Sequence, residues 1–342
     1  MKLKERIEIC YGKNQREVEV DFSSIPILGT GGIIGYASRP LYDGESVLIG
    51  RKGTIGMPFY INKPFWTIDT LFYTKINRSI ILPKYLYYCL MTIGLERYSE
   101  GAAVPSLTTK TLYDIEINVP RMEIQQHIVN TIGSIDDLIE NHNNQIKKIL
   151  LLGDLLICQS AEIEKLTKYA NISLGGTPSR SHPEYWNGKI KWINSGAMTD
   201  SPAIMEQTEF ITELGVKNSA TKCAVEGDTV LSIIDPSTNK VSVVLDDNIY
   251  FNQSVICLSA KNKKDKGLVY FGGKRLVDEI KGYATGAAQQ SLNKEMFEIS
   301  EIHIPNSHTI ERLNELLDRI IELEKRIRLL NRLKIRLLSK YF

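Results

Sequence analysis

The sequence has few cysteines, and none of them lies in a pattern that binds a metal. The five cysteines are far apart, no Cys-x-x-Cys pair is present, and the five histidines do not cluster with them. Such spacing argues against a zinc site and predicts scattered, buried thiols in a reducing compartment. These thiols are Cys10, Cys89, Cys158, Cys223 and Cys257. We expect no metal in this chain.

Long hydrophobic runs are also missing. The most apolar stretch, residues 149–158, is interrupted by Asp154 and is too short to span a bilayer. The first ten residues, MKLKERIEIC, lack the apolar core of a signal peptide. We therefore expect a cytoplasmic protein with no membrane partner. The net charge is only +2, so any binding of nucleic acid must come from local basic patches.

Sequence motifs for common catalytic sites are absent as well. There is no Gly-x-x-x-x-Gly-Lys-Ser/Thr loop for ATP, and no Asn-Pro-Pro-aromatic motif of the kind that amino-methyltransferases carry. Gly29, Gly31 and Gly35 are spaced too widely for a dinucleotide loop and favour a β-turn. The single Glu-x-Lys segment, Glu279 to Lys281, favours a helix surface over a nuclease site. We expect no catalytic residue and no cofactor in this chain.

The clearest positive feature is a long internal repeat. Residues 98–120 (YSEGAAVPSLTTKTLYDIEINVP) match residues 283–305 (YATGAAQQSLNKEMFEISEIHIP) at a constant offset. A shorter match joins residues 42–49 to residues 225–232. A period of about half the chain is too long for a solenoid and indicates a duplicated two-part unit. Such a chain can present two similar surfaces to one long, regular partner.

Each repeat combines a strand-rich segment with a helical one. Short β-type runs and glycine turns fill residues 1–119 and 166–304, and one helix is predicted from Pro83 to Tyr98. Residues 121–165 and 306–342 instead carry apolar residues at alternating steps of four and three, the pattern of a coiled-coil seam. His142 and Gly153 are the weak points of the first seam. The predicted pairing residues are Ile128, Ile132, Ile135, Ile139, Ile146, Ile149, Leu316, Ile320, Leu323, Ile327, Leu330 and Leu337.

The two helical segments carry opposite net charge. Residues 121–165 hold four basic and seven acidic residues, whereas residues 306–342 hold nine basic and five acidic ones. This difference favours pairing of the two helices with each other, because a long amphipathic helix needs a partner for its apolar stripe. The alternative is that each stripe packs on its own globular unit. The basic residues from Lys325 to Lys340 could be solvated, contact DNA phosphates or meet an acidic partner.

The loops of the strand-rich segments contain the residue types that bind nucleic acid. Arginine and lysine match guanine edges and phosphates, and asparagine and glutamine match adenine. Each such residue, taken singly, is more often an ordinary surface residue than a DNA contact, and Trp186 and Trp192 are more often core residues than contacts. The candidate DNA contacts are Tyr11, Lys13, Asn14, Arg39, Arg51, Lys52, Thr177, Ser179, Arg180, Lys189, Lys191, Asn239, Lys240, Gln289 and Gln290.

Several of these segments resemble one known family. LGGTPS at residues 174–179, followed by EYWNGKIKW at 184–192, resembles the opening of a target-recognition domain in specificity subunits of type I restriction–modification enzymes. YGKNQ at residues 11–15 resembles another opening of that domain. The GAAxxSL segments at 101–107 and 286–292 resemble the family's junction between domain and spacer helix. The first domain has no counterpart of GTPS or EYW.

The resemblance implies an α+β fold. Two α/β target-recognition domains, residues 1–119 and 167–304, would alternate with spacer helices at 120–166 and 305–342 that pair as an antiparallel coiled coil. Each domain would read one half of a bipartite site in double-stranded DNA. Methyltransferase (modification) subunits would supply S-adenosylmethionine chemistry at adenine N6. Restriction (helicase/nuclease) subunits would use ATP and Mg.

Two other classes of function remain open from the sequence. One is a non-catalytic coiled-coil scaffold without a DNA role. The other is an enzyme whose site carries no familiar motif. Salt-dependent binding to DNA would separate the first from a specificity subunit, and activity of the isolated chain on DNA would reveal the second.

Overall fold

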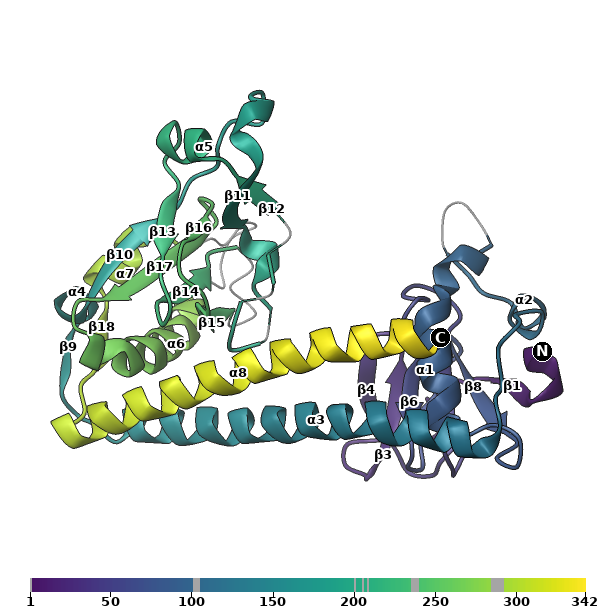
Figure 1. The fold of residues 1–342 in the computed structure, drawn as a ribbon. Helices are drawn as coiled ribbons and strands as arrows, with labels where there is room; N and C mark the ends of the chain where they lie inside the picture. Colours follow the sequence, from purple (N-terminus) through teal and green to yellow (C-terminus); the bar gives the residue numbers. More distant parts are fainter. Residues whose placement is uncertain are drawn as a thin grey trace. The chain divides into compact units, whose positions relative to one another are not determined.

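The computed structural model describes residues 2–100, 105–199, 201–204, 206–207, 209–234, 240–283 and 292–342, with the backbone alone at 281–283. The chain divides into two compact units (Figure 1). Unit 1 is Met1–Leu138 with Leu330–Phe342, and unit 2 is Ile139–Leu329. Two long helices, α3 (Met122–Cys158) and α8 (Ser307–Tyr341), contribute residues to both units. The helix predicted over 306–342 is therefore confirmed, whereas the one predicted over 121–165 ends earlier, at Cys158, and residues 163–165 form a strand instead.

Unit 1 contains two four-stranded sheets. The first sheet has the order β1-β8-β5-β6 and is antiparallel, and the second has the order β2-β4-β3-β7 with β3 and β7 parallel. The strands are β1 (Ile7–Tyr11), β2 (Glu19–Val20), β3 (Ile25–Gly29), β4 (Gly32–Ala37), β5 (Ser46–Gly50), β6 (Phe59–Ile61), β7 (Trp66–Thr67) and β8 (Leu71–Ile76). Every residue of β5 is buried, so this strand lies at the centre of the unit.

Helix α1 (Pro83–Ile93) covers the first sheet, and a shorter helix, α2 (Thr109–Tyr113), precedes α3. Proline occupies the first turn of α1, where its missing N–H is not needed. The helix was predicted to reach Tyr98, but it ends at Gly94, whose φ of 68° is left-handed and stops the helical path. A 3₁₀ turn then covers Leu95–Tyr98.

Unit 2 repeats this plan. Its antiparallel sheet has the order β10-β17-β14-β15, its second sheet the order β12-β11-β16-β13 with β11 and β16 parallel, and β9 pairs with β18. The elements are β9 (Ile163–Lys165), α4 (Leu166–Tyr169), β10 (Ala170–Leu174), β11 (Trp186–Ile193), β12 (Glu209–Ile211), α5 (Glu213–Lys217), β13 (Lys222–Ala224), β14 (Thr229–Ser232), β15 (Val241–Val243), β16 (Ile249–Phe251), β17 (Val255–Ala260), α6 (Lys266–Tyr283), α7 (Lys294–Ile299) and β18 (Glu301–His303). The mixed α+β class predicted from the sequence is confirmed.

The duplication seen in the sequence is visible in the strand order. In the sheets β1-β8-β5-β6 and β10-β17-β14-β15, the strand that comes first in the sequence pairs with the strand that comes last, which in turn pairs with a buried central strand, and a helix follows that last strand. The short match of residues 42–49 to 225–232 contains the starts of β5 and β14, the two central strands. Glycine residues with positive φ, Gly44 and Gly227, stand in the turns before these strands. The same local sequence therefore makes the same turn and strand twice.

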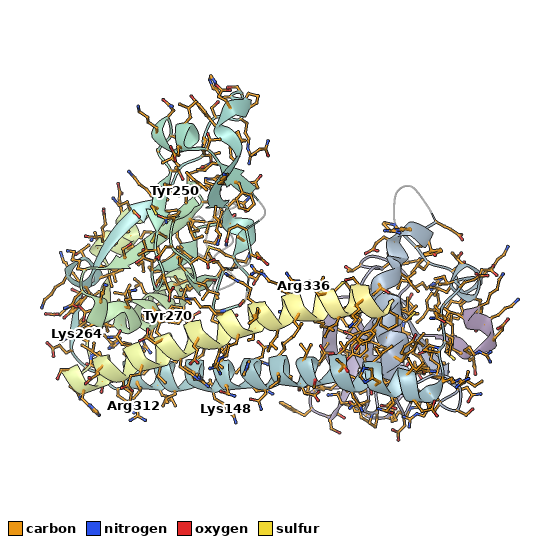
Figure 2. All side chains as sticks on the ribbon, in the orientation of Figure 1. Lys148, Tyr250, Lys264, Tyr270, Arg312 and Arg336 are labelled. Atoms are coloured by element: carbon orange, nitrogen blue, oxygen red, sulfur yellow. The ribbon has the colours of Figure 1, made fainter. Side chains whose placement is uncertain are left out.

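Helix α6 packs closely on the long helices within unit 2. A Cβ atom added at Gly153 of α3 would lie 2.1 Å from the Phe271 ring of α6. A Cβ atom at Gly267 of α6 would lie 2.3 Å from the Leu313 backbone of α8. Tyr270, labelled in Figure 2, is fully buried beside Phe271. Gly153, a weak point of the predicted seam, is thus the place where α6 approaches α3.

Helices α3 and α8 also contact each other inside each unit. In unit 1, Lys334 lies 2.6 Å from Asp136, and the Tyr341 ring centroid lies 6.1 Å from that of His127. The two helices are therefore antiparallel where they meet in this unit. In unit 2, Ile146 packs with Leu323 and Ile327. Of the predicted pairing residues, seven are buried: Ile128, Ile132, Ile135, Ile146, Ile320, Leu323 and Ile327. Five are half-buried: Ile139, Ile149, Leu316, Leu330 and Leu337.

The two ends of α8 pack into different hydrophobic cores. Leu313, Leu317 and Ile321, which the four-three pattern missed, are buried in the core of unit 2. Leu338 is buried in the core of unit 1, to which Ile128 also belongs. The stripe of α8 is therefore wider than a coiled-coil seam, because the globular parts cover it as well as α3. The apolar stripe of α8 thus packs partly on α3 and partly on the globular parts of the two units, so each of the two predicted modes of packing accounts for part of it.

The cysteines are all free, but they are not all buried. Cys89 and Cys257 are buried and Cys10 is half-buried, whereas Cys158 and Cys223 are exposed. The prediction of buried thiols is wrong for these last two, because Cys158 ends α3 and Cys223 lies in the edge strand β13.

Candidate nucleic-acid interface

On unit 1, the predicted residues Tyr11 and Arg51 meet at the ends of β1 and β5. The Arg51 guanidinium lies 5.2 Å from the centroid of the exposed Tyr11 ring and donates a hydrogen bond to the Asp69 carbonyl at 3.2 Å. Next to them, the backbone of Gly12 approaches Ile68 so closely that a Cβ would lie 1.9 Å from the Ile68 carbonyl oxygen. This contact holds Tyr11 on a rigid frame, where the cation–π pair presents one aromatic and one cationic group to solvent.

A glycine hairpin stands beside this pair. Strands β3 and β4 are joined at Gly29–Gly32, where Gly32 has a φ of +112°, so the predicted β-turn is confirmed. A Cβ at Gly53 would lie 3.6 Å from Thr30 Oγ1, which places the loop after Arg51 against the hairpin turn. Ile33 and Ile34 near this turn are 58% and 50% exposed. The sequence reasoning missed them, although two adjacent isoleucines after a glycine turn are a visible signal of an exposed apolar tip.

The other candidates on unit 1 differ in position. Lys52 is exposed in the loop next to Arg51, and Lys13 is exposed directly after Tyr11, with its N–H bound to the Thr67 carbonyl at 2.8 Å. The Asn14 side chain accepts a hydrogen bond from the Arg16 N–H and so shapes its own loop. Arg39 is exposed beyond the end of β4 that lies away from the hairpin turn. The structure brings Tyr11, Arg51 and their neighbours together and leaves Arg39 apart.

On unit 2, Arg180 is held inside an aromatic and acidic cluster. Its guanidinium carbon lies 3.4 Å from the centroid of the Trp186 ring, and Nη2 lies 2.9 Å from Glu209 Oε1. The Trp186 indole donates to the Ser179 carbonyl at 3.2 Å and packs edge-on against Trp192. The charge of Arg180 is therefore matched by a carboxylate. Trp192 is buried, so its predicted core position is confirmed, whereas Trp186 is half-buried.

The remaining candidates on unit 2 are scattered. Thr177 donates to Gln253 and Ser179 lies 2.7 Å from Ser181, both at the exposed start of the domain. Lys189 is exposed on β11, Lys191 pairs with Asp246 at 2.9 Å, and Lys240 is half-buried. Three further candidates lie outside the described residues: Asn239, Gln289 and Gln290. Residues 101–104 and 286–291 of the repeated GAAxxSL motif lie outside them too.

A small cavity of about 120 Å³ lies beside the Arg180 cluster. Trp192 forms part of its wall, together with the amides of Asn194 and Gln207 and the carboxylate of Glu209. Such groups match the donors and acceptors on base edges, with amides suited to adenine and a carboxylate to cytosine. Sequence reasoning missed Asn194 and Gln207, because nothing local shows that the ends of β11 and β12 meet.

The basic residues near the end of α8 are mostly engaged within the chain. Lys325 lies 2.6 Å from Glu226, Arg328 lies 2.8 Å from Asp246, and Arg326 pairs with Glu322 one turn earlier. In unit 1, Lys334 pairs with Asp136. The charge pattern left three roles open for this segment, and the geometry adds a fourth, in which acidic groups of the same chain hold these cations. Exposed charges of the long helices, such as Lys148 and Arg312, are labelled in Figure 2.

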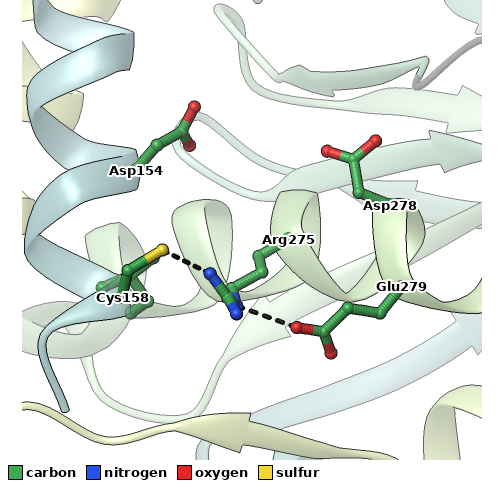
Figure 3. Close-up of a pocket in the computed structure, with 6 residues that line it drawn as sticks. Asp154, Cys158, Arg275, Asp278 and Glu279 are labelled. Carbon is green, nitrogen blue, oxygen red and sulfur yellow. Dashed lines mark hydrogen bonds and ion pairs between the residues drawn. The ribbon is translucent and has the colours of Figure 1, made fainter.

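A larger pocket of unit 2 is lined mainly by charged side chains. It measures about 340 Å³ and lies between α3 and α6, where Arg275 Nη1 contacts Cys158 and Nε lies 2.8 Å from Glu279 (Figure 3). Glu279 lies on the surface of α6, as predicted. Among the residues that the structure describes, no three histidine, cysteine or acidic side chains come close enough to hold a metal ion.

One buried carboxyl gives unit 2 a distinctive response to pH. Asp228, only 5% exposed, accepts hydrogen bonds from the Val225 N–H and the Ser259 hydroxyl. Burial raises its pKa above the usual 3.8 in spite of these bonds. The folded state therefore binds the carboxyl proton of Asp228 more tightly than the unfolded state does. The stabilisation from the protonated Asp228 is lost as pH rises above about 4 and this proton dissociates.

We therefore expect Asp228→Asn to gain stability relative to the wild type as pH is raised from about 3.5 to 7. Urea unfolding at several pH values measures this difference. Asp114→Asn is the control of opposite sign, because the hydrogen bond from Lys2 lowers the pKa of Asp114. A pH-independent difference between Asp228→Asn and the wild type would contradict the assignment.

Comparison with known proteins agrees with this architecture. The family model described as type I restriction modification DNA specificity domain matches residues 8–151 and 161–334. The chain is 24% identical over 338 residues to the specificity subunit of the type I restriction enzyme MjaIX from Methanocaldococcus jannaschii, covering 89% of this chain and 78% of the relative. It is 26% identical over 264 residues to the EcoR124I/EcoR124II specificity subunit of Escherichia coli, covering 72% of this chain and 65% of that relative.

A solved structure shows the same fold. The S subunit of a type I restriction–modification system from M. genitalium superposes with a TM-score of 0.62 at 14% identity, over 100% of this chain and 95% of that one. In the described part of the chain, no helix has both the length and the apolar character to cross a membrane. The matched family segments cover most of both units and both long helices. The chain belongs to the family of type I restriction–modification DNA specificity domains and is a DNA sequence-specificity subunit.

Proposed function

We propose that each unit reads one half of a bipartite site in double-stranded DNA, and that α3 and α8 form the antiparallel coiled-coil spacer between the two readers. The observation that supports this most is the repeated strand order, β1-β8-β5-β6 and β10-β17-β14-β15, with each sheet followed by a helix. Two copies of one scaffold with different loops can read two different sequences, in the way that paired modules read spaced half-sites.

The candidate reading surfaces differ in chemistry. Unit 1 offers the Tyr11–Arg51 pair, Lys52 and the apolar hairpin tip. Unit 2 offers exposed Lys189 and the amide-lined cavity beside Glu209. A lost base contact would relax one position of the target, whereas a lost phosphate contact would weaken binding to all sequences alike.

The chemistry in this proposal belongs to partner subunits in the cytoplasm. Modification subunits would transfer a methyl group from S-adenosylmethionine to adenine N6 after the base is flipped out of the duplex. Restriction subunits would use ATP and Mg. The present chain would locate the target and hold these partners.

Reconstitution tests this division of labour. The purified chain alone is expected to leave DNA unmethylated, and addition of a cognate modification subunit with S-adenosylmethionine is expected to give adenine methylation at one bipartite motif. Sequencing that detects methyladenine is the readout, and the modification subunit alone is the control. Methyl transfer by the chain alone would overturn the non-catalytic role. Binding to DNA that does not weaken with salt would argue against a DNA reader.

A further inference from the structure

Two acidic turns of unit 2 rest on the basic side of α8. The first, residues 225–228, joins β13 to β14, and the second, residues 244–248, joins β15 to β16. We call them together the acidic double turn. Glu226 of the first turn lies 2.6 Å from Lys325, and Asp246 of the second lies 2.8 Å from Arg328. Opposite charges therefore meet where the domain touches the helix.

The acidic double turn is internally braced. The Glu226 N–H donates to the Asp247 carboxylate at 3.1 Å, and the Gly227 N–H donates to the Val244 carbonyl at 2.9 Å. Gly227 and Asn248 adopt left-handed φ values of 86° and 60°, which fix the two reversals. These hydrogen bonds couple the two turns. A contact made by either turn holds both.

Asp246 connects the helix to the strand that carries the candidate reading residues. Its Oδ2 accepts hydrogen bonds from Arg328 at 2.8 Å and from Lys191 at 2.9 Å. Lys191 belongs to β11, the strand that also holds Lys189 and Trp192. The Arg328 side chain is 16% exposed and that of Asp246 is 30% exposed, so water screens this pair less than the more exposed Lys325–Glu226 pair. Burial opposes ionisation of Asp246, but the hydrogen bonds from Lys191 and Arg328 prevail and lower its pKa.

This polar contact is separate from the apolar attachment of the same domain. That attachment lies nearer the start of α8, where Gly267 approaches Leu313 and its N–H binds the Asn314 side chain at 2.6 Å. From residue 314 to residue 328 the helix advances about 21 Å. Apolar burial is non-directional, whereas a charge-assisted hydrogen bond is directional. Two attachments this far apart fix both the position and the direction of the domain on the helix.

We propose that Arg328, Asp246 and Lys191 are positioning residues that form an orientation clamp, which sets the direction of β11 relative to α8. The effect of this clamp on DNA recognition rests on the proposed function. In a bipartite reader, the direction of β11 fixes where the second half-site must lie, so the clamp makes the protein selective for one gap length. None of the three residues needs to touch DNA for this role.

The test is methylation by the reconstituted complex on targets whose gap is the natural one, or one base pair longer or shorter. Arg328→Met removes the charge and keeps the length of the side chain. We expect its rate on the natural gap to fall by roughly tenfold to a hundredfold, with a smaller loss on the altered gaps, so that gap preference weakens. Arg328→Lys should restore part of the preference. Arg312→Met, at an exposed arginine of the same helix, is the matched control (Figure 2).

An equal loss on every gap length would assign Arg328 a merely stabilising role and overturn the clamp, as would no loss at all. A second measurement needs no DNA. Spin labels are attached to cysteines introduced at exposed Lys217 of α5 and Glu315 of α8, and the exposed Cys158 and Cys223 are replaced by serine. The distance between the two labels reports the direction of the domain relative to α8. The distance distribution should broaden in Arg328→Met, and an unchanged distribution overturns the clamp. A wild-type complex that methylates no bipartite target would instead refute the proposed function, while the label distances still decide on the clamp.

Discussion

Replacing Gly153 with alanine should lower the free energy of unfolding by about 1–3 kcal/mol, or more if the site cannot relax. Inside a helix, alanine normally stabilises relative to glycine by about 1 kcal/mol. At this position the new Cβ would lie 2.1 Å from the ring of Phe271, which is fully buried. Steric overlap therefore reverses the usual sign.

The same helix provides the matched control. A Cβ at Gly133 would meet the flexible end of Lys84 at 3.2 Å, and this side chain can swing away. Gly133→Ala should therefore be neutral or gain up to about 1 kcal/mol. Urea unfolding followed by circular dichroism measures both variants. Equal changes of the same sign would show that α6 does not pack on α3 as described.

Exchange of residues 167–304 for the corresponding domain of another specificity subunit should change one half of the methylated motif completely and leave the other half intact. The reason is that β11, β12 and the loops after β10 belong to this segment, whereas the Tyr11–Arg51 surface does not. Sequencing of methyladenine in cells that carry the hybrid measures both halves at once.

The incoming domain of the hybrid must still pack on α8. The incoming domain should retain acidic residues at the positions of Glu226 and Asp246, because Lys325 and Arg328 stay on α8. A hybrid with alanine at both positions serves as the control, because its domain lacks these two ion pairs with α8. If the exchange altered both halves of the motif, or neither, the assignment of one half-site to each unit would fail.

The sequence was sufficient where the determining pattern is local. The four-three spacing from Ile128 to Ile149 identified α3, and the glycines near residue 31 identified the β3–β4 turn, since each depends on neighbours only. The internal match at residues 42–49 and 225–232 located two corresponding strands for the same reason.

It was insufficient where two distant segments meet. Arg180 was predicted only as a candidate DNA contact in a loop. Its partner Glu209 is brought to it by the pairing of β11 with β12, in which Trp192 lies opposite Glu209. The need for glycine at position 153 depends on Phe271, whose position is set by the packing of α6. Likewise, the acidic residues that hold Arg328 and Lys334 lie far from α8 in the sequence.

The division of α8 between two cores has a consequence for synthesis on the ribosome. Residues 330–342 belong to unit 1, where Leu338 is buried in the same core as Ile128 and the Phe342 ring centroid lies 5.2 Å from that of Tyr85. These residues leave the ribosome only after all of unit 2 has been made. The sheets and helices of unit 1 therefore remain incomplete, with part of their apolar surface uncovered, until residues 330–342 have been synthesised. The unit that is synthesised first is the last to be completed.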